Sequence, residues 1–221
     1  MTYIMHWYFR LRDLRDAAKW STHVPLSDIT VHVCYTHATM DQTLHLEKIA
    51  AFTPFDEAEL SHQQATLSFV KNHDDFYKRA LVTGHITGSA WIINPAATHA
   101  LMLHHKKLDR WLQPGGHIEH EADVLDTALR EAQEETGISG LRVVKDAIFD
   151  IDIHTIPENR KEREHQHYDI RYLLEAELNA IPAASDESND VKWFTLDEIA
   201  TINDDASIQR MIAKTIALRN H

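Results

Sequence analysis

The feature that most constrains this chain is a pair of glycines followed by a strongly patterned helical segment. Gly115 and Gly116 precede a stretch that begins near Asp123 and stops near Gly137. Asp is a common helix N-cap, and Gly commonly ends a helix in the left-handed conformation. Between these ends, apolar residues recur on one side of a 3.6-residue period. They are Leu125, Ala128, Leu129 and Ala132. The segment therefore predicts a glycine turn followed by a helix that buries one face against a sheet.

Another side of the same helix carries three carboxylates. At 100° per residue, Glu131, Glu134 and Glu135 fall within about one third of the helix circumference. Like charges at these spacings repel one another and lower helix stability. A hard divalent cation such as Mg²⁺ or Mn²⁺ offsets this repulsion, because it binds carboxylate oxygens. The face is thus either an acidic, solvated surface or a metal site, and Arg130 is spaced to pair with Glu134.

The spacing of these residues resembles the Nudix box. In that motif a Gly precedes five residues, a Glu, seven residues, Arg-Glu, an apolar residue, one residue, Glu-Glu, one residue, Gly and an apolar residue. The matching positions are Gly116, Arg130, Glu131, Ala132, Glu134, Glu135, Gly137 and Ile138. The first Glu of the box falls on Ala122, with Glu121 beside it. In the family that Glu mainly supports the loop and helix, so the departure bears on local rigidity more than on catalysis.

The resemblance implies an α/β fold, a Nudix-type α/β/α sandwich around a mixed sheet, here with an N-terminal helical extension. It is strong over residues 115–138, weaker over 83–200 and absent from 1–40. We expect an extension over residues 1–80 and a Nudix hydrolase domain with a C-terminal helix over residues 81–221. The implied reaction is hydrolysis of the diphosphate bond of a nucleoside diphosphate linked to another moiety. ADP-ribose, nucleotide sugars and modified dNTPs are the candidate substrates.

The same resemblance implies roles for the residues of the box. Glu131, Glu134 and Glu135 would bind Mg²⁺ (or Mn²⁺), aided by the carbonyl of Gly115, and Glu131 and Glu134 would carry the catalysis. Glycines allow close approach of backbone N–H groups to a phosphate, so Gly115 and Gly116 are expected to contact substrate. We also expect Arg130 to belong to the substrate-binding site, where it orients the glutamates more than it touches substrate.

In this family the general base is often a Glu on a later loop. The charged segment 155–164 offers Glu164 as the first candidate for this role, followed by Glu162 and Glu158. A prenyl-diphosphate isomerase on the same fold needs a catalytic Cys near the metal, and the single Cys34 lies far upstream. A catalytically inactive nucleotide-binding or regulatory protein is the other alternative, and the three retained glutamates argue against it.

Polar residues alternate along two consecutive predicted strands after the box. Asp150, Asp152 and His154 share one face of the first strand, and His165, His167 and Asp169 share one face of the second. A reversal through 155–164 would make these strands antiparallel neighbours with both polar sets on one side. This side is either a solvated sheet face or a substrate cleft in which His165 and His167 donate to phosphate or ribose. A transition-metal site is a third reading, which the hard-cation chemistry of the resemblance disfavours.

Elsewhere the periodicity predicts helices over 41–54, 57–72 and 207–219, and strands over 89–93, 99–105, 141–153, 165–174 and 191–194. Residues 28–35 could form a strand with no obvious partner. The helices before residue 80 suggest a packing element, or alternatively a lid or the interface of a homodimer.

The composition restricts the partners and the compartment. With 22 basic and 34 acidic residues, the net charge is −12 with His neutral, which disfavours a nucleic acid polymer as partner. The partner that the resemblance implies is a nucleotide-derived small molecule. One cysteine excludes an intrachain disulfide, so we expect a cytoplasmic protein. No apolar run approaches the length of a membrane span, and no signal peptide is legible.

Overall fold

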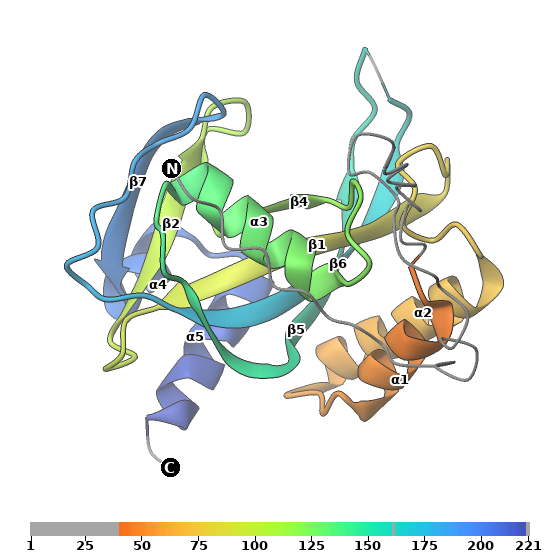
Figure 1. Cartoon of the computed structure of the whole chain (residues 1–221), viewed down its shortest axis with the longest axis horizontal. Helices are drawn as coiled ribbons and strands as arrows, with labels where there is room; N and C mark the ends of the chain where they lie inside the picture. Colours follow the sequence, from red (N-terminus) through yellow and green to blue (C-terminus); the bar gives the residue numbers. More distant parts are fainter. Residues whose placement is uncertain (1–39, 161, 220–221) are drawn as a thin grey trace, which may run out of the picture. The chain divides into compact units, whose positions relative to one another are not determined.

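The computed structural model describes residues 40–160 and 162–219 (Figure 1). All of the elements below lie in one compact unit, His37–His221. The candidate strand over residues 28–35 lies outside the described residues. None of the helices in the described part of the chain has the length and apolar character that crossing a membrane requires.

Five helices and seven strands follow one another along these residues. The helices are α1 (Gln42–Ala51), α2 (Glu57–Asn72), α3 (Val124–Thr136), α4 (Leu196–Ile202) and α5 (Ala206–Leu218). The strands are β1 (Gly84–Ile93), β2 (His99–His105), β3 (Arg110–Leu112), β4 (Gly115–His117), β5 (Arg142–Ile156), β6 (His165–Glu175) and β7 (Ser188–Thr195).

The strands form one mixed sheet in the order β3-β2-β1-β6-β5, with β4 on β1 and β7 on β2. Strand β1 pairs in parallel with β6 along its whole length, and the other pairings are antiparallel. A single register pair, Ile93 with Ala100, joins β1 to β2. The sheet is therefore mixed, as the resemblance implies.

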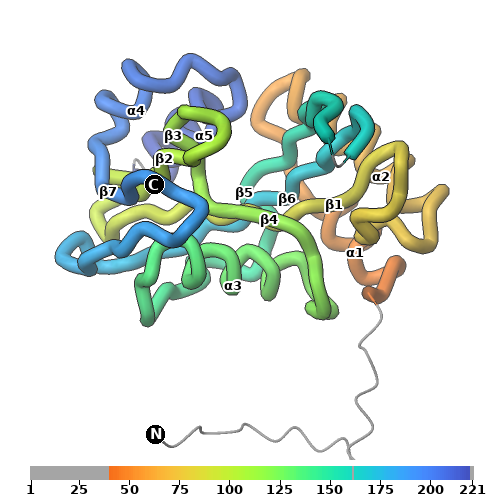
Figure 2. Tube along the Cα trace, turned by 90° about the horizontal axis from the view of Figure 1, so that it is seen from above, coloured from red at the N-terminus to blue at the C-terminus, as the bar shows by residue number. Residues whose placement is uncertain are grey.

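Helices cover both faces of this sheet (Figure 2). Helix α3 packs against β1, β4 and β6. It approaches closely at Gly88, where an added Cβ would lie 2.9 Å from the carbonyl oxygen of Val124. On the opposite face, the indole N–H of Trp91 donates to the hydroxyl of Thr215 in α5 at 2.9 Å. A side chain at residue 88 would push α3 from the sheet, so this glycine sets the depth at which the helix lies.

The apolar core is divided by the sheet into two clusters. The larger one joins the α3 face of the sheet to α1 and α2, with Ile86, Leu101 and Ala128 fully buried. The smaller one lies between the sheet and α4 and α5, with Trp91 and Met211 fully buried. The α/β/α arrangement follows from burying both faces of the strands.

Three details of the sequence-based expectation need correction. Strand β1 begins at Gly84 rather than at residue 89. The short strand β3 precedes the two glycines, and Gly115 and Gly116 themselves lie in strand β4 rather than in a turn. In α5, the helical periodicity predicts that Ile216 belongs to a buried apolar stripe, but Ile216 is 42% exposed. Arg210 and Lys214 are buried in the same helix instead, because acidic partners in the sheet and in α2 pair with them.

Candidate active site

Helix α3 begins and ends at the residues that the sequence indicates. The Asp123 carboxylate accepts the backbone N–H of Leu125 at 3.1 Å. At the other end, Gly137 has φ +66°, the left-handed conformation that favours glycine, and its N–H donates to the carbonyl of Gln133 at 2.9 Å. Ala128 and Ala132 are fully buried against the sheet. The caps fix the ends of α3, and the buried alanines fix its rotation about its own axis, so that the carboxylates lie on a different face from the alanines.

The glycines of β4 lie directly against these carboxylates. The N–H of Gly115 donates to Oε2 of Glu135 at 2.9 Å. A Cβ built at Gly116 would lie 2.3 Å from Oε1 of Glu131. A side chain at residue 116 would therefore have to displace the Glu131 carboxylate, so β4 and α3 form one site.

Negative charge is concentrated in this site. Burial, together with repulsion from Glu131 and Glu134, raises the pKa of Glu135 to about 7. Burial also raises the pKa of Glu131. The side chains of Glu131, Glu134 and Glu135 offer carboxylate oxygens as metal ligands, the ligand type that Mg²⁺ and Mn²⁺ prefer. The residues present thus fit the divalent cation that the resemblance implies, because such a cation would neutralise carboxylates that burial now disfavours.

Arg130 connects these glutamates to the glycine loop. Its Nη1 donates to Oε1 of Glu131 at 2.9 Å and to Oε2 of Glu134 at 3.0 Å. Its Nη2 donates to the carbonyl of His117 at 2.9 Å, and its Nε donates to Glu121 at 2.5 Å. All three nitrogens are thus bonded to the protein itself, an arrangement that suits a residue that positions the glutamates.

Glu121 supports the loop next to the position where the motif departs. Its Oε2 accepts the backbone N–H groups of Glu119 and His120, at 2.9 and 3.1 Å. Although burial opposes the shift, the bond from Arg130 lowers the pKa of Glu121 to about 2. Ala122 itself is exposed. The sequence analysis assigns no role to Glu121. The one signal that could have found it is a carboxylate one residue before Ala122, where the motif has its first Glu.

The candidate bases lie on the segment between β5 and β6. Glu164 and Glu158 are exposed. Glu162 accepts the Nε–H of Arg79 at 2.6 Å, and this bond lowers its pKa. Within residues 40–160 and 162–219, no hydrogen bond or ion pair joins Glu164 to the α3 carboxylates. The structure thus brings together the predicted residues of the box and β4, and leaves these loop glutamates outside their bonding network.

The two polar strands after the box are antiparallel neighbours, as expected. Asp152 lies opposite Asp169, and His154 lies opposite His167. The expectation of a solvated face or an open cleft is wrong for the acidic half, since Asp150 is fully buried and Asp169 is 2% exposed. Helices α2 and α5 contribute residues that pair with these acids, and the sequence pattern of β5 and β6 alone does not reveal them.

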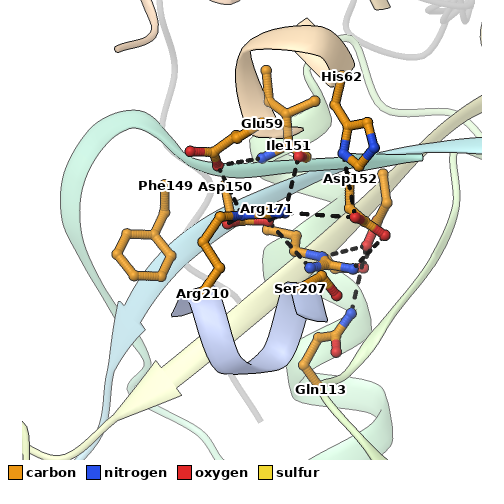
Figure 3. Close-up of polar contacts among 12 residues, drawn as sticks. Glu59, His62, Gln113, Phe149, Asp150, Ile151, Asp152, Arg171, Ser207 and Arg210 are labelled. Atoms are coloured by element: carbon orange, nitrogen blue, oxygen red, sulfur yellow. Dashed lines mark hydrogen bonds and ion pairs between the residues drawn. The ribbon is translucent and has the colours of Figure 1, made fainter. Parts of the chain in front are cut away.

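Figure 3 shows the buried ion-pair network that occupies this acidic half. Arg171 donates to Asp169 at 2.7 Å and to Asp150 at 3.1 Å. From α5, Arg210 and Lys214 reach Asp150 at 2.8 and 2.9 Å. From α2, Glu59 pairs with Lys214 and accepts the N–H of Ile151. The acids therefore attach two helices to the sheet and are not free to bind substrate.

The histidine half of the face is a separate group. His165 is 8% exposed, His167 is half-buried, and their Nε2 atoms lie 3.3 Å apart. His85 and His117 lie beside them, with ring centroids 4.8 and 5.1 Å from that of His167. The sequence did not single out these last two residues, because only the pairing of β1 with β6 and β4 brings them here.

Comparisons with known proteins found similar sequences and similar structures. A probable DHNTP pyrophosphohydrolase of Lactococcus lactis subsp. cremoris (strain MG1363) is 46% identical over 68 residues, which are 30% of this chain and only 40% of that protein. A C. elegans Ap4A hydrolase in a binary complex gives a TM-score of 0.49 at 21% identity, covering 60% of this chain and 96% of that one. The E. coli dihydroneopterin triphosphate pyrophosphohydrolase gives 0.46 at 16% identity, covering 58% and 92%.

The family model described as the NUDIX domain matches residues 85–215. This span runs from β1 into α5 and contains the whole site formed by β4 and α3. Because the match covers more than half of the chain, the protein belongs to the Nudix family.

Proposed function

We propose that this protein hydrolyses the diphosphate bond of a nucleotide-derived small molecule in a reaction that depends on Mg²⁺ or Mn²⁺. The observation that supports this most is the site in which Glu135 accepts the Gly115 N–H at 2.9 Å and Glu131 lies against Gly116, while Arg130 holds Glu134 beside them. Oxygen ligands at this density are suited to a hard cation and to little else.

In this proposal each residue of the site has a distinct task. Glu131, Glu134 and Glu135, with the carbonyl of Gly115, would hold the cation. When bound, such a cation neutralises charge on a diphosphate and lowers the pKa of a bound water. Arg130 keeps the carboxylates of Glu131 and Glu134 oriented. This orientation holds the ligands in place before substrate binds.

Glycine and loop residues complete the site. Gly116 leaves room for the Glu131 carboxylate, and without a side chain its backbone could also approach a phosphate. Glu164 is the first candidate to accept the proton of the attacking water, followed by Glu162 and Glu158. Glu164 is exposed and unpaired within residues 40–160 and 162–219, whereas Glu162 pairs with Arg79. A free carboxylate suits a base better than a paired one.

The comparisons support a class of candidate substrates. The Lactococcus relative supports dihydroneopterin triphosphate as a candidate. ADP-ribose, nucleotide sugars and modified dNTPs are equally candidate substrates, since this relative is matched over only 40% of its length. The net charge of −12 supports a small molecule rather than a nucleic acid polymer. A cytoplasmic location, supported by the single cysteine, and a homodimer complete the proposal.

A substrate panel tests this function. The full chain is incubated with each candidate in Mg²⁺, in Mn²⁺ and in EDTA, and the phosphorus products are identified by ³¹P NMR. We expect at least one candidate to be cleaved at a diphosphate bond with either cation and none in EDTA. Cleavage that continues at full rate in EDTA would overturn the metal dependence, and inertness towards every diphosphate tested would overturn the activity.

A further inference from the structure

A cluster of histidines lies where the first residues of β1 and β6 meet β4. The parallel register sets His85 opposite His167, and the two-residue period of β6 puts His165 on the same face. The ligand nitrogens of these three residues all lie within 4.8 Å of one another. His117 from β4 adds a fourth ring, whose centroid is 4.9 Å from that of His85. Four imidazoles from three strands therefore converge on one small volume.

The centre of this cluster is buried and lacks hydrogen bonds. His85 is 1% exposed, and in the described part of the chain neither of its ring nitrogens has a hydrogen-bond partner. Nε2 of His117 is likewise buried without a partner among those residues. Leaving a buried polar atom unpaired is unfavourable. A bound cation would satisfy one nitrogen of each ring that binds it, whereas packing alone satisfies none of them.

The geometry of His165 and His167 is compatible with two ligands of one metal ion. Nδ1 of His165 lies 2.8 Å from the carbonyl of Arg163, to which it donates, so its Nε2 keeps a free lone pair directed at the cluster. The Nε2 atoms of His165 and His167 are 3.3 Å apart. Two nitrogens bound tetrahedrally to Zn²⁺ at about 2.0–2.1 Å lie about 3.3–3.4 Å from each other.

The protonation state agrees with this arrangement. Burial, followed by repulsion from neighbouring histidines, lowers the pKa of His85 to about 4. The same two causes lower the pKa of His167. Both rings are therefore neutral near pH 7, and the neutral imidazole is the form that binds a metal.

We propose that His85, His165 and His167, with His117 beside them, form a binding site for a divalent transition metal of the Zn²⁺ type. Its ligands are nitrogens, whereas the α3 site offers oxygens, so the two sites select different metals. The site joins the first residues of β1 to those of β6. It is a structural addition to the protein and does not depend on which substrate the α3 site takes.

Metal titration of the full chain tests this site. The protein is freed of metal with a chelator, supplied with excess Mg²⁺ to occupy the carboxylates of α3, and titrated with Zn²⁺ by calorimetry and thermal melting. We expect one equivalent of Zn²⁺ to bind and to raise the melting temperature, since a ligand of the native state stabilises it. Replacing Zn²⁺ by Co²⁺ should give the visible absorption of a nitrogen-ligated, four-coordinate ion.

Variants assign the binding to the histidines. His85→Ala and His167→Ala should each weaken Zn²⁺ binding by at least about tenfold, a loss that even outer ligand partners produce. His165→Gln and His167→Gln keep the side-chain volume and should bind no better, so a folding defect is distinguishable from ligand loss. His120→Ala, at an exposed histidine outside the cluster, and Glu134→Gln, in the α3 site, should bind Zn²⁺ as the wild type does.

Three outcomes would overturn the proposal. One is the absence of stoichiometric Zn²⁺ binding in excess Mg²⁺. Another is unchanged Zn²⁺ affinity in the histidine variants, whatever the affinity of Glu134→Gln. The third is a rise in KM for His165→Gln and His167→Gln without any metal binding, which would assign these residues to substrate, as the sequence pattern suggested.

Discussion

At the scale of single residues, Arg130 is the centre of the α3 site. It joins Glu131 and Glu134 to the carbonyl of His117 and is itself held by Glu121. A guanidinium can make these contacts at once because its five N–H donors lie in one rigid plane. The geometry of the glutamates therefore depends on Glu121, although Glu121 is outside the matched positions of the box.

Removing the Glu121 carboxylate should weaken both the fold and the activity. We expect Glu121→Ala to lower the free energy of unfolding by about 2 kcal/mol, because charged hydrogen bonds from Arg130 and from two backbone N–H groups are lost. The value of kcat should fall as well, since Arg130 loses an anchor. Urea denaturation and steady-state kinetics measure the two effects.

The matched control is Glu119→Ala, at a carboxylate whose side chain is 66% exposed. It should change stability by less than about 0.5 kcal/mol. Adding Ala122→Glu to Glu121→Ala should restore little, because residue 122 is exposed in the loop. Equal stability of Glu119→Ala and Glu121→Ala, or full rescue by the second substitution, would show that Glu121 has no special role.

At the scale of elements, α2 is attached to the sheet and to α5 through Glu59. This fully buried carboxylate pairs with Lys214 of α5 and accepts the N–H of Ile151 in β5. Three elements that are distant in sequence thus meet at one side chain, so the helices before residue 80 are part of the fold that carries the site.

Breaking this contact should be costly. Glu59→Ala leaves Lys214 without one of its partners in a buried position, and loss of one member of a buried pair typically costs about 3–5 kcal/mol. Glu57→Ala, at an exposed position in the first turn of the same helix, should cost less than about 1 kcal/mol. Denaturant midpoints that are equal for the two variants would mean that α2 contributes little to the fold.

At the scale of the whole molecule, the sequence predicts helix limits, which depend on local patterns, but not the contacts between residues that are distant in sequence. The limits of α3 were predictable because Asp123 and Gly137 act within one helix turn. Strands β3 and β4 have only three residues each, too few to show a period of two. The Glu59–Lys214 pair is separated by 155 residues, and the pairing of His85 with His167 needs the parallel register of β1 and β6. No sequence window contains either.

Truncation tests which part of the chain the fold requires. A chain that begins at Met40 keeps every described element and should retain the melting temperature and the turnover of the full chain. One that begins at Gly84 lacks α1 and α2, and so exposes the buried partners of Glu59. It should be insoluble or unfolded by circular dichroism. Loss of soluble protein for the chain that begins at Met40 would show that the first 39 residues complete the fold or an interface.

The central claim is that the carboxylates of α3 carry a cation-dependent hydrolysis. Single-turnover cleavage of the best substrate is measured against Mg²⁺ concentration for the wild type, for Glu134→Gln and for Glu57→Gln as the exposed control. We predict saturable Mg²⁺ dependence in the wild type and in Glu57→Gln. For Glu134→Gln, we predict a rate lower by at least about a hundredfold, or about 2.7 kcal/mol of transition-state stabilisation, with an unchanged melting temperature. Wild-type rates from Glu134→Gln, with or without Mg²⁺, would contradict the assignment.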